Sequence, residues 1–301
     1  MDMTIIDDIA RLKKDRKAII LAHNYQRSEV QDIADYVGDS FGLSQKAVEA
    51  DAEVIVFCGV DFMAESAAIL NPDKVVLNPM PEAECPMARM ISAADVKALR
   101  GRYPGAEVVC YVNSSADVKA ESDVCCTSSN AVKVVNSLEG SEAIFVPDRN
   151  LAYYTQKFTQ KKIHAWHGYC PTHHLITAGD VLVAKMEHPG AEVLVHPECR
   201  PEVIDLADKV FSTDGMVKYA REAKTELIIG TESGLLHRLE KENPGKRFYP
   251  LSSYTVCPNM KMNSLETVRD SLQTLRTPIR VPEDIRIRAK RALDRMLEVG
   301  R

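Results

Sequence analysis

The sequence predicts an α/β protein made of three pseudo-threefold-related α/β/α domains, whose parallel sheets surround one central site. Three observations predict it: a cysteine–proline pair that recurs, residues at matched spacings, and apolar runs that alternate with helical segments. The pairs are Cys85-Pro86, Cys170-Pro171 and Cys257-Pro258, which lie 85 and 87 residues apart. Self-similarity at a fixed period marks a fold built from repeated units.

The matched spacings extend well beyond the cysteines. In each copy a ring-bearing residue lies 17 positions before a hydroxyl residue, a polar residue follows the ring by two positions, and an aspartate lies five positions before the hydroxyl. The phrase Pro-Gly-Ala-Glu-Val recurs at 104–108 and 189–193, each 19 residues past a cysteine. The four sets are His23, Tyr111 and His196; Tyr25, Asn113 and Glu198; Asp35, Asp123 and Asp208; and Ser40, Ser128 and Thr213.

Each copy alternates short apolar runs, which we interpret as strands, with segments of helical pattern. The first strand precedes a helical stretch that carries the aspartate, then a helix that the hydroxyl residue opens or precedes, and then a second strand. A further helix and a third apolar run lead to the cysteine. Such alternation indicates parallel strands with helical crossovers. The predicted strands are Ala18–Ala22, Val54–Cys58, Val75–Leu77, Glu107–Cys110, Ala143–Val146, Ile163–Ala165, Glu192–Val195, Glu226–Ile229 and Phe248–Leu251.

The repeat divides the chain into three modules, each of which ends near its cysteine. We place them at residues 1–86, 87–171 and 172–301, and the third includes additional C-terminal helices. Modules of about 85 residues are sufficient for a three-layer α/β unit. Ser264–Leu275 resembles the helix that begins each copy, and Pro282–Val299 is a charged helix that we expect to clamp the outside.

Composition restricts the class of protein. A net charge of −5 argues against a nucleic-acid partner, because no strongly basic face is evident. No apolar stretch approaches the ~18 residues of a membrane span, and the start of the chain does not resemble a signal peptide. We therefore expect a cytoplasmic protein without a membrane partner. In a reducing compartment its eight cysteines are better explained as metal ligands, catalytic groups or core residues than as disulfides.

Three equivalent cysteines predict an iron–sulfur cluster that leaves one iron without a protein ligand. Cysteine thiolates are the usual ligands of such clusters, and proline stiffens the loop that presents the sulfur. A structural zinc site normally takes four ligands with two closely spaced, and no Cys-x-x-Cys occurs here. Cys58 and Cys110 end apolar strands and are interpreted as core residues. Cys199, beside Glu198, could line the site.

The other repeated positions predict a pocket for anions. Ser40, Ser128 and Thr213 lie where helices begin, and helix N-termini bind anions through their free N–H groups. Capping of those helices would also explain them. The ring-bearing set and the polar set lie at the ends of first strands, the edge at which α/β folds bind ligands.

At these residues the chain resembles the quinolinate synthase family, from about residue 23 to residue 263. The resemblance rests on Leu-Ala-His-Asn-Tyr-Gln at 21–26, Gly-Asp-Ser at 38–40, Cys-Tyr-Val-Asn at 110–113, Thr-Ser-Ser-Asn at 127–130, His-Pro-Glu-Cys at 196–199, Ser-Thr-Asp-Gly at 212–215 and Cys-Pro-Asn-Met at 257–260. It implies condensation of iminosuccinate (iminoaspartate) with dihydroxyacetone phosphate to quinolinate, phosphate and water, in NAD biosynthesis. It also implies a 4Fe–4S cluster whose open iron acts as a Lewis acid.

The resemblance also assigns roles to individual residues. Met260 stands where some members carry a second cysteine, so this chain is similar to the type without Cys-x-x-Cys at the third ligand. We expect a partly desolvated pocket to raise the pKa of Glu198, which would act in proton transfer. The implied metal ligands are Cys85, Cys170 and Cys257. The implied catalytic residues are Tyr25, Tyr111, His196 and Glu198. The implied substrate contacts are His23, Ser40, Tyr111, Val112, Asn113, Ser128, His196, Pro197, Glu198 and Thr213.

Two alternatives stay open at this point. The diphthamide-forming radical enzymes share a plan of three domains with one cysteine each, although the Tyr-x-Asn, His-x-Glu and Gly-Asp-Ser strings argue against them. An iron–sulfur sensor that only binds a dicarboxylate would need no turnover. For an enzyme of the family, the expected partners are the two small anionic substrates and an L-aspartate oxidase or dehydrogenase that supplies the imine.

Overall fold

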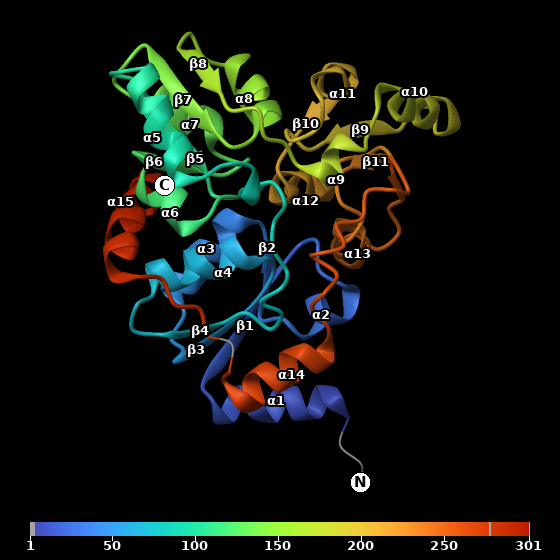
Figure 1. The fold of residues 1–301 in the computed structure, drawn as a ribbon. Coiled ribbons are helices and arrows are strands. Elements are labelled where there is room, and N and C mark those ends of the chain that lie inside the picture. The colour runs from blue at the N-terminus through green and yellow to red at the C-terminus, as the bar shows by residue number, and fades with distance from the viewer. Residues whose placement is uncertain (1–3, 277, 301) are drawn as a thin grey trace.

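The structure of the protein, a computed structural model that describes residues 4–276 and 278–300, consists of three similar α/β units. Each unit has a four-stranded parallel sheet, in the orders β2-β1-β3-β4, β6-β5-β7-β8 and β10-β9-β11-β12 (Figure 1). The predicted fold class is confirmed. The strands are β1 Ala18–His23, β2 Tyr36–Gly38, β3 Val54–Cys58, β4 Val75–Leu77, β5 Glu107–Tyr111, β6 Val124–Cys126, β7 Glu142–Val146, β8 Lys162–Ala165, β9 Glu192–Val195, β10 Lys209–Val210, β11 Leu227–Gly230 and β12 Phe248–Pro250.

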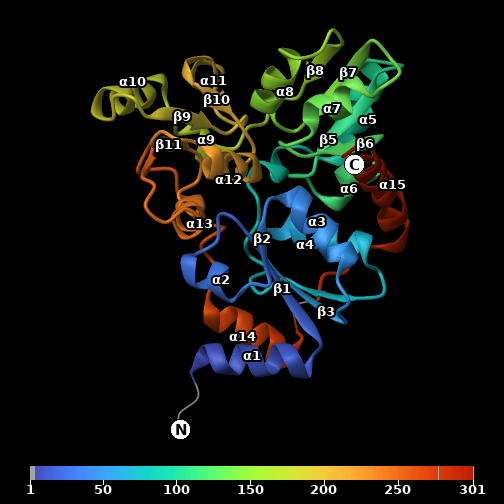
Figure 2. The ribbon, with the colours of Figure 1, turned by 180° about the vertical axis from the view of Figure 1, so that it is seen from behind.

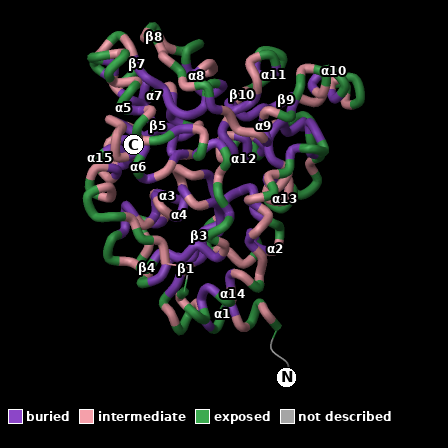
Figure 3. The backbone as a smooth tube through the Cα atoms, in the orientation of Figure 1, coloured by how far each residue is buried: buried purple, intermediate pink, exposed green. Residues whose placement is uncertain are grey.

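The central strands of each sheet are apolar on both faces because helices cover both sides. Every residue of β3 is buried, as are all four of β11. Near-continuous Val, Ile and Leu runs are typical of such doubly covered parallel strands. Buried backbone is densest where the three units meet at the middle of the molecule (Figure 3).

The edge strands β2, β6 and β10 are absent from the predicted set, and they explain the repeated aspartates. These aspartates do not lie on a helix, as the sequence suggested, but between a helix and the edge strand. Asp35 accepts a hydrogen bond from the Ile20 N–H at 2.8 Å, and its own N–H donates to the Ile20 carbonyl at 2.9 Å. Asp123 and Asp208 make the same pair of bonds to Val108 and Val193. The repeated aspartates are therefore structural.

Four helices begin with the same capping motif, which marks the start of each repeat. In α1, α5, α10 and α14 a Ser or Thr before the helix bonds the N–H three residues later, and that third residue bonds back. The helices are α1 Ile5–Asp15, α2 Ser28–Ile33, α3 Ser40–Glu49, α4 Asp61–Leu70, η1 Ala88–Met90, α5 Ala93–Arg102, α6 Ala116–Ala120, α7 Ala131–Asn136, α8 Arg149–Gln156, α9 Pro171–His174, α10 Ala178–Glu187, α11 Pro201–Leu206, α12 Thr213–Glu222, α13 Leu235–Glu242, α14 Leu265–Thr274 and α15 Glu283–Gly300.

The C-terminal helices return to the first two units. Helix α14 lies beside α1, as the view from behind shows (Figure 2). Helix α15 packs against α6 and β6 and buries Ala289, Ala292, Leu293 and Met296. Its apolar face joins the core, while the helix lies at the periphery of the second unit and also contacts α4 of the first, as expected of an external clamp. The division of the chain into domains at 86/87 and 171/172 stays a prediction. No helix in the described part of the chain is long and apolar enough to span a bilayer.

Candidate active site

A cavity of about 160 Å³ lies where the three units meet, and it brings together nearly all of the predicted site residues. The side chains that line it from the predicted set are His23, Tyr25, Ser40, Cys85, Tyr111, Asn113, Ser128, Cys170, His196, Glu198, Thr213 and Cys257. Val112 and Pro197 do not line it. Val112 is buried in the core, and Pro197 lines an adjacent outer cavity that shares Asp39 and Ser128 with the inner one.

Each of the three Cys-Pro pairs begins a turn, and only in the second unit does this turn become an α-helix. Cys170 caps α9, and Pro171 is the first residue of that helix. The backbone N–H three residues later, on Ala88, His173 and Met260, faces the sulfur of Cys85, Cys170 and Cys257 and in part lowers the pKa of that thiol. Burial nevertheless raises the pKa of all three thiols, that of Cys85 to about 12. A bound metal would have to displace these protons.

The cysteine set fits a cluster with three protein ligands. One thiol comes from each unit, and the other five cysteines are buried in the core and do not line the cavity. Cys199 is among those five, and its sulfur lies 3.6 Å from the Gly230 carbonyl oxygen. One buried carboxylate oxygen beside the Cys170 turn, Oδ2 of Asp148, has no hydrogen-bond partner. Thiol donors from three units around one cavity are what a cluster with an open iron requires.

The hydroxyl residues do not cap helices, because their neighbours do. Asp39 caps α3 and Ser212 caps α12, and Ser40 and Thr213 are the first residues of those helices. Ser128 lies in the turn before α7 and contacts Nε2 of His196 at 3.2 Å. All three hydroxyl residues therefore line the cavity without a capping function.

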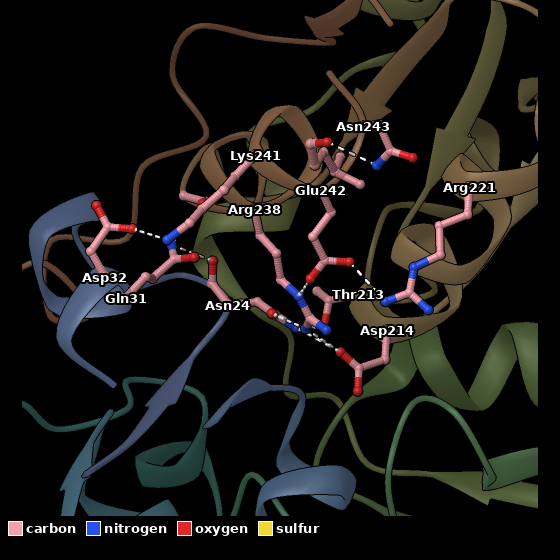
Figure 4. Close-up of polar contacts among 12 residues, drawn as sticks. Asn24, Gln31, Asp32, Thr213, Asp214, Arg221, Arg238, Lys241, Glu242 and Asn243 are labelled. Atoms are coloured by element: carbon pink, nitrogen blue, oxygen red, sulfur yellow. Dashed lines mark hydrogen bonds and ion pairs between the residues drawn. The ribbon is translucent and has the colours of Figure 1, made fainter. Parts of the chain in front are cut away.

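Thr213 is held by a polar network between the first and third units (Figure 4). The amide of Asn24, which is fully buried, donates to Thr213 Oγ1 at 2.8 Å and to Asp214 Oδ1 at 3.1 Å. Arg238 donates to the Asn24 carbonyl oxygen at 2.7 Å and to Asp214 at 2.9 Å. Lys241 of the third unit reaches Asp32 of the first. This network fixes two walls of the cavity relative to each other.

Two histidines at strand ends face the cavity as neutral rings. Burial lowers the pKa of His23 to about 4 and that of His196 to about 3. Nδ1 of each ring accepts the backbone N–H two residues on, from Tyr25 at 3.2 Å and from Glu198 at 3.3 Å. The Nε2 atom then carries the proton of the neutral ring and can donate it in a hydrogen bond.

The sequence missed His173, which completes the acid–base cluster. Its Nδ1 lies 2.6 Å from Glu198 Oε2 and 3.2 Å from the Cys170 sulfur, and its ring stacks on His196. Donor atoms of Cys170, His173 and Glu198 all lie within 4.8 Å of one another. The corresponding positions after Cys85 and Cys257 are Ala88 and Met260, so comparison of the repeats gives no signal for a histidine. Only its position in a cysteine turn could have indicated it.

Glu198 is a carboxylate, which corrects the expected direction of its pKa. Burial alone would raise the pKa of Glu198, but the imidazole of His173, whose Nδ1 lies 2.6 Å from the carboxylate, holds it at about 2. Burial and this carboxylate together raise the pKa of Tyr25 and Tyr111 well above the ordinary value. The Tyr25 hydroxyl lies 2.6 Å from Thr231 Oγ1 and 3.4 Å from Nε2 of His173. Glu198 is thus an anionic base beside two protonated phenols.

Comparison with known proteins agrees with this arrangement. The model of the family described as quinolinate synthetase A protein matches residues 7–298. The chain is 57% identical to a quinolinate synthase of Methanoregula boonei over 300 residues, covering 99% of both chains. It is also 57% identical to one from Methanosarcina barkeri over 296 residues, covering 98% of this chain and 97% of that protein. One from Dehalococcoides mccartyi strain CBDB1 is 57% identical over 292 residues, covering 97% of both. The chain therefore belongs to the quinolinate synthase family.

Proposed function

We propose that this protein is a quinolinate synthase, which condenses iminosuccinate with dihydroxyacetone phosphate and releases phosphate and two waters. The observation that carries the proposal is the composition of one buried cavity, which combines a cysteine turn from each unit with hydroxyl, imidazole and carboxylate groups. This composition matches a reaction of two anions that involves several proton transfers and no net electron transfer. Family membership supplies the reaction, and the cavity supplies residues suited to it.

Neutral hydrogen-bond donors suit the binding of the two anionic substrates. Ser40 and Thr213 open helices α3 and α12, both of ten residues, so the positive end of each helix dipole is directed toward their hydroxyls. The Nε2–H groups of His23 and His196 add two donors from opposite units. We assign substrate carboxylates and phosphate to these groups. Tyr111, Val112, Asn113, Ser128 and Pro197 are proposed as further contacts, by backbone in the case of Val112 and Pro197.

Glu198 is the proposed base, and His173 its partner. A carboxylate 2.6 Å from an imidazole nitrogen can take a proton from substrate and share it with that ring. The protonated phenols of Tyr25 and Tyr111 can donate to a leaving hydroxyl, and His196 can orient Glu198. These groups provide both halves of the enolisation and of the two dehydrations.

Cys85, Cys170 and Cys257 are the proposed ligands of a 4Fe–4S cluster. When bound, such a cluster supplies a Lewis-acidic iron that polarises a hydroxyl or carboxylate oxygen of the substrate. The chain's own contribution is to present three thiols at one wall and to exclude water. Enclosure of the cavity by three units would protect the imine from hydrolysis.

The imine is unstable, so its source is part of the proposal. We propose that an L-aspartate oxidase or dehydrogenase supplies it, and that the protein acts in the cytoplasm. The test is to prepare the protein without oxygen, to quantify iron and sulfide per chain, and to add freshly generated iminosuccinate with dihydroxyacetone phosphate. Quinolinate formation that depends on both substrates is expected. Protein that holds the cluster and binds dicarboxylates but forms no quinolinate would refute the proposal.

A further inference from the structure

Each of the three cysteines is preceded by an acidic residue that lies just past the third strand of its unit. Asp61 follows β3, Asp148 follows β7 and Glu232 follows β11. They precede their cysteines by 24, 22 and 25 residues. Asp148 and Glu232 are completely buried, and the Asp61 side chain is 20% exposed. The proposed chemistry leaves all three carboxylates without a task, although each belongs to the site by position in the repeat.

The backbone N–H of the cysteine is the group that each carboxylate faces. Cys85 N donates to Asp61 Oδ1 at 3.1 Å, and Cys257 N donates to Glu232 Oε1 at 3.1 Å. In the second unit the Cys170 N–H also faces its acid, Asp148, and in part lowers the pKa that burial and Glu198 raise. The Oδ2 atom of Asp148, however, has no hydrogen-bond partner.

The other contacts of the three acids differ from unit to unit. Asp61 pairs with Arg89 at 3.3 Å, and Glu232 pairs with Lys261 at 2.9 Å. Asp148 instead caps α8 by accepting two backbone N–H groups at 2.7 and 2.8 Å. Asp61 and Glu232 share the cysteine N–H as a partner, at 3.1 Å in both units. Asp148 and Glu232 share a different one, the backbone N–H two residues on, at 2.7 Å in both units. A bond to the cysteine that is kept in two units, although their ion pairs differ, points to a task that the repeat retains.

We propose that Asp61 and Glu232 are positioning residues that fix the turns of Cys85 and Cys257, so that their sulfurs converge on one cluster with that of Cys170. This inference rests on the cluster of the proposed function and deepens it. In the turns of Cys85 and Cys257 the carboxylate accepts the N–H of the cysteine, the proline fixes φ of the next residue, and the N–H three residues on faces the sulfur. The turn is thus held on both sides of the ligand atom. Groups of this kind orient metal ligands, and their loss typically lowers the affinity for the metal by about 10–100-fold.

The test compares an acceptor that is kept with one that is removed, in anaerobically prepared full-length protein. Glu232→Gln and Asp61→Asn retain an oxygen that can accept the cysteine N–H, whereas Glu232→Leu and Asp61→Ala do not. The readouts are iron and sulfide per chain and the rate at which a chelator bleaches the cluster. We expect the amide variants to behave as wild type. We expect the apolar variants to lose the cluster about tenfold faster.

Glu65 provides the matched control. Its partly buried carboxylate also accepts a backbone N–H, that of Ala116 at 3.0 Å, and among the described residues it makes no hydrogen bond to a cysteine turn. Glu65→Leu should therefore keep the wild-type rate of cluster loss. Wild-type rates in both apolar variants, or equal loss in Glu65→Leu, would overturn the positioning role alone. A wild-type protein without a cluster would refute the proposed function, and this inference with it. Circular dichroism shows which variants fold. If Glu232→Leu does not fold, the comparison of Asp61→Asn with Asp61→Ala tests the proposal instead.

Discussion

Two walls of the cavity have diverged to very different degrees. At the cysteine wall all three units keep the Cys-Pro pair, a backbone N–H that faces the sulfur and an acid before the cysteine. At the strand-end wall one repeat position holds His23, Tyr111 and His196, and the next holds Tyr25, Asn113 and Glu198. The backbones of both walls are nevertheless equivalent, since the three sheets share one strand order.

The difference follows from the symmetry of what each wall would contact. A cubic cluster with three protein ligands has a threefold axis, so identical turns serve it. Two unlike substrates have no such axis, and their donors, acceptors and bases must differ from unit to unit. A triplicated fold can therefore retain its symmetry at one wall and lose it at the other. The predictions below test this division, from the largest expected effect to the smallest.

We expect the cysteine wall to require the cysteine that each unit supplies. Replacing Cys85, Cys170 or Cys257 with alanine is expected to abolish cluster binding and turnover, because two thiols cannot hold the cluster. Iron and sulfide analysis of anaerobic protein checks this. Cys58→Ala and Cys110→Ala, which alter buried cysteines outside the cavity, are the controls. Folded control protein without iron would break the threefold assignment of ligands.

The strand-end wall should depend most on its single carboxylate. Glu198→Gln is expected to keep the fold and the cluster but to lower kcat by roughly 10²-fold or more, in the range of a lost general base. The amide cannot take a proton, although it can still bond His173. Single-turnover measurement with both substrates checks the chemical step. Near-normal turnover would remove Glu198 from the mechanism and transfer the base to His173 or Tyr25.

The hydroxyls should contribute binding without contributing to the fold. Ser128→Ala and Thr213→Ala each remove a group that lines the cavity while the helix caps remain. The Asn24 amide that donates to Thr213 keeps its bond to Asp214, so only a small loss of stability is expected. A hydrogen bond to a charged partner contributes about 1.5–3 kcal/mol, which predicts a rise of roughly 10–100-fold in the Kd of a dicarboxylate analogue. Ser212→Ala, which removes the cap of α12, should show the reverse pattern. Unfolding of the cavity variants with unchanged affinity would make these residues structural.

Much of the fold could be predicted because its strands carry their own signal. Buried parallel strands such as Val54–Cys58 are apolar throughout, and the repeat fixed the register of their counterparts. The edge strands β2, β6 and β10 could not be predicted because they are short: β10, Lys209–Val210, has only two residues, and Lys209 is exposed. The position of β10 depends on Asp208, whose bonds to β9 are long-range.

The site divides in the same way. Residues that recur in all three units were predicted, because repetition is visible in a sequence. His173 was not, because it replaces an alanine and a methionine at its repeat position. The pKa of Glu198 was assigned the wrong direction for the same reason, since the imidazole that lowers it belongs to a residue that repetition does not reveal.

The prediction with the smallest effect at neutral pH concerns the loss of stability that results from burying the imidazole of His23. His23 has a pKa of about 4 in the folded protein and an ordinary value near 6.5 when unfolded. Between these values the unfolded chain binds more protons, so stability from this group falls as pH falls through 6.5 toward 4. From pH 8 to pH 5 the loss is about 2 kcal/mol. The His23→Gln variant has no titrating group at this position. Between pH 8 and pH 5 it should therefore lose about 2 kcal/mol less stability than wild type.

The comparison between the two proteins isolates His23, because other groups act equally in both. Asp39, whose pKa burial and Asp214 raise to about 7, titrates in the same window with the opposite sign, so the slope of wild type alone is not diagnostic. The measurement is the urea unfolding free energy of both proteins at pH 5 and pH 8. The unfolding free energy of wild type minus that of His23→Gln should be smaller at pH 5 than at pH 8. Parallel curves would mean that His23 is charged in the folded protein, and the cavity would then bind anions with a cation rather than with neutral donors.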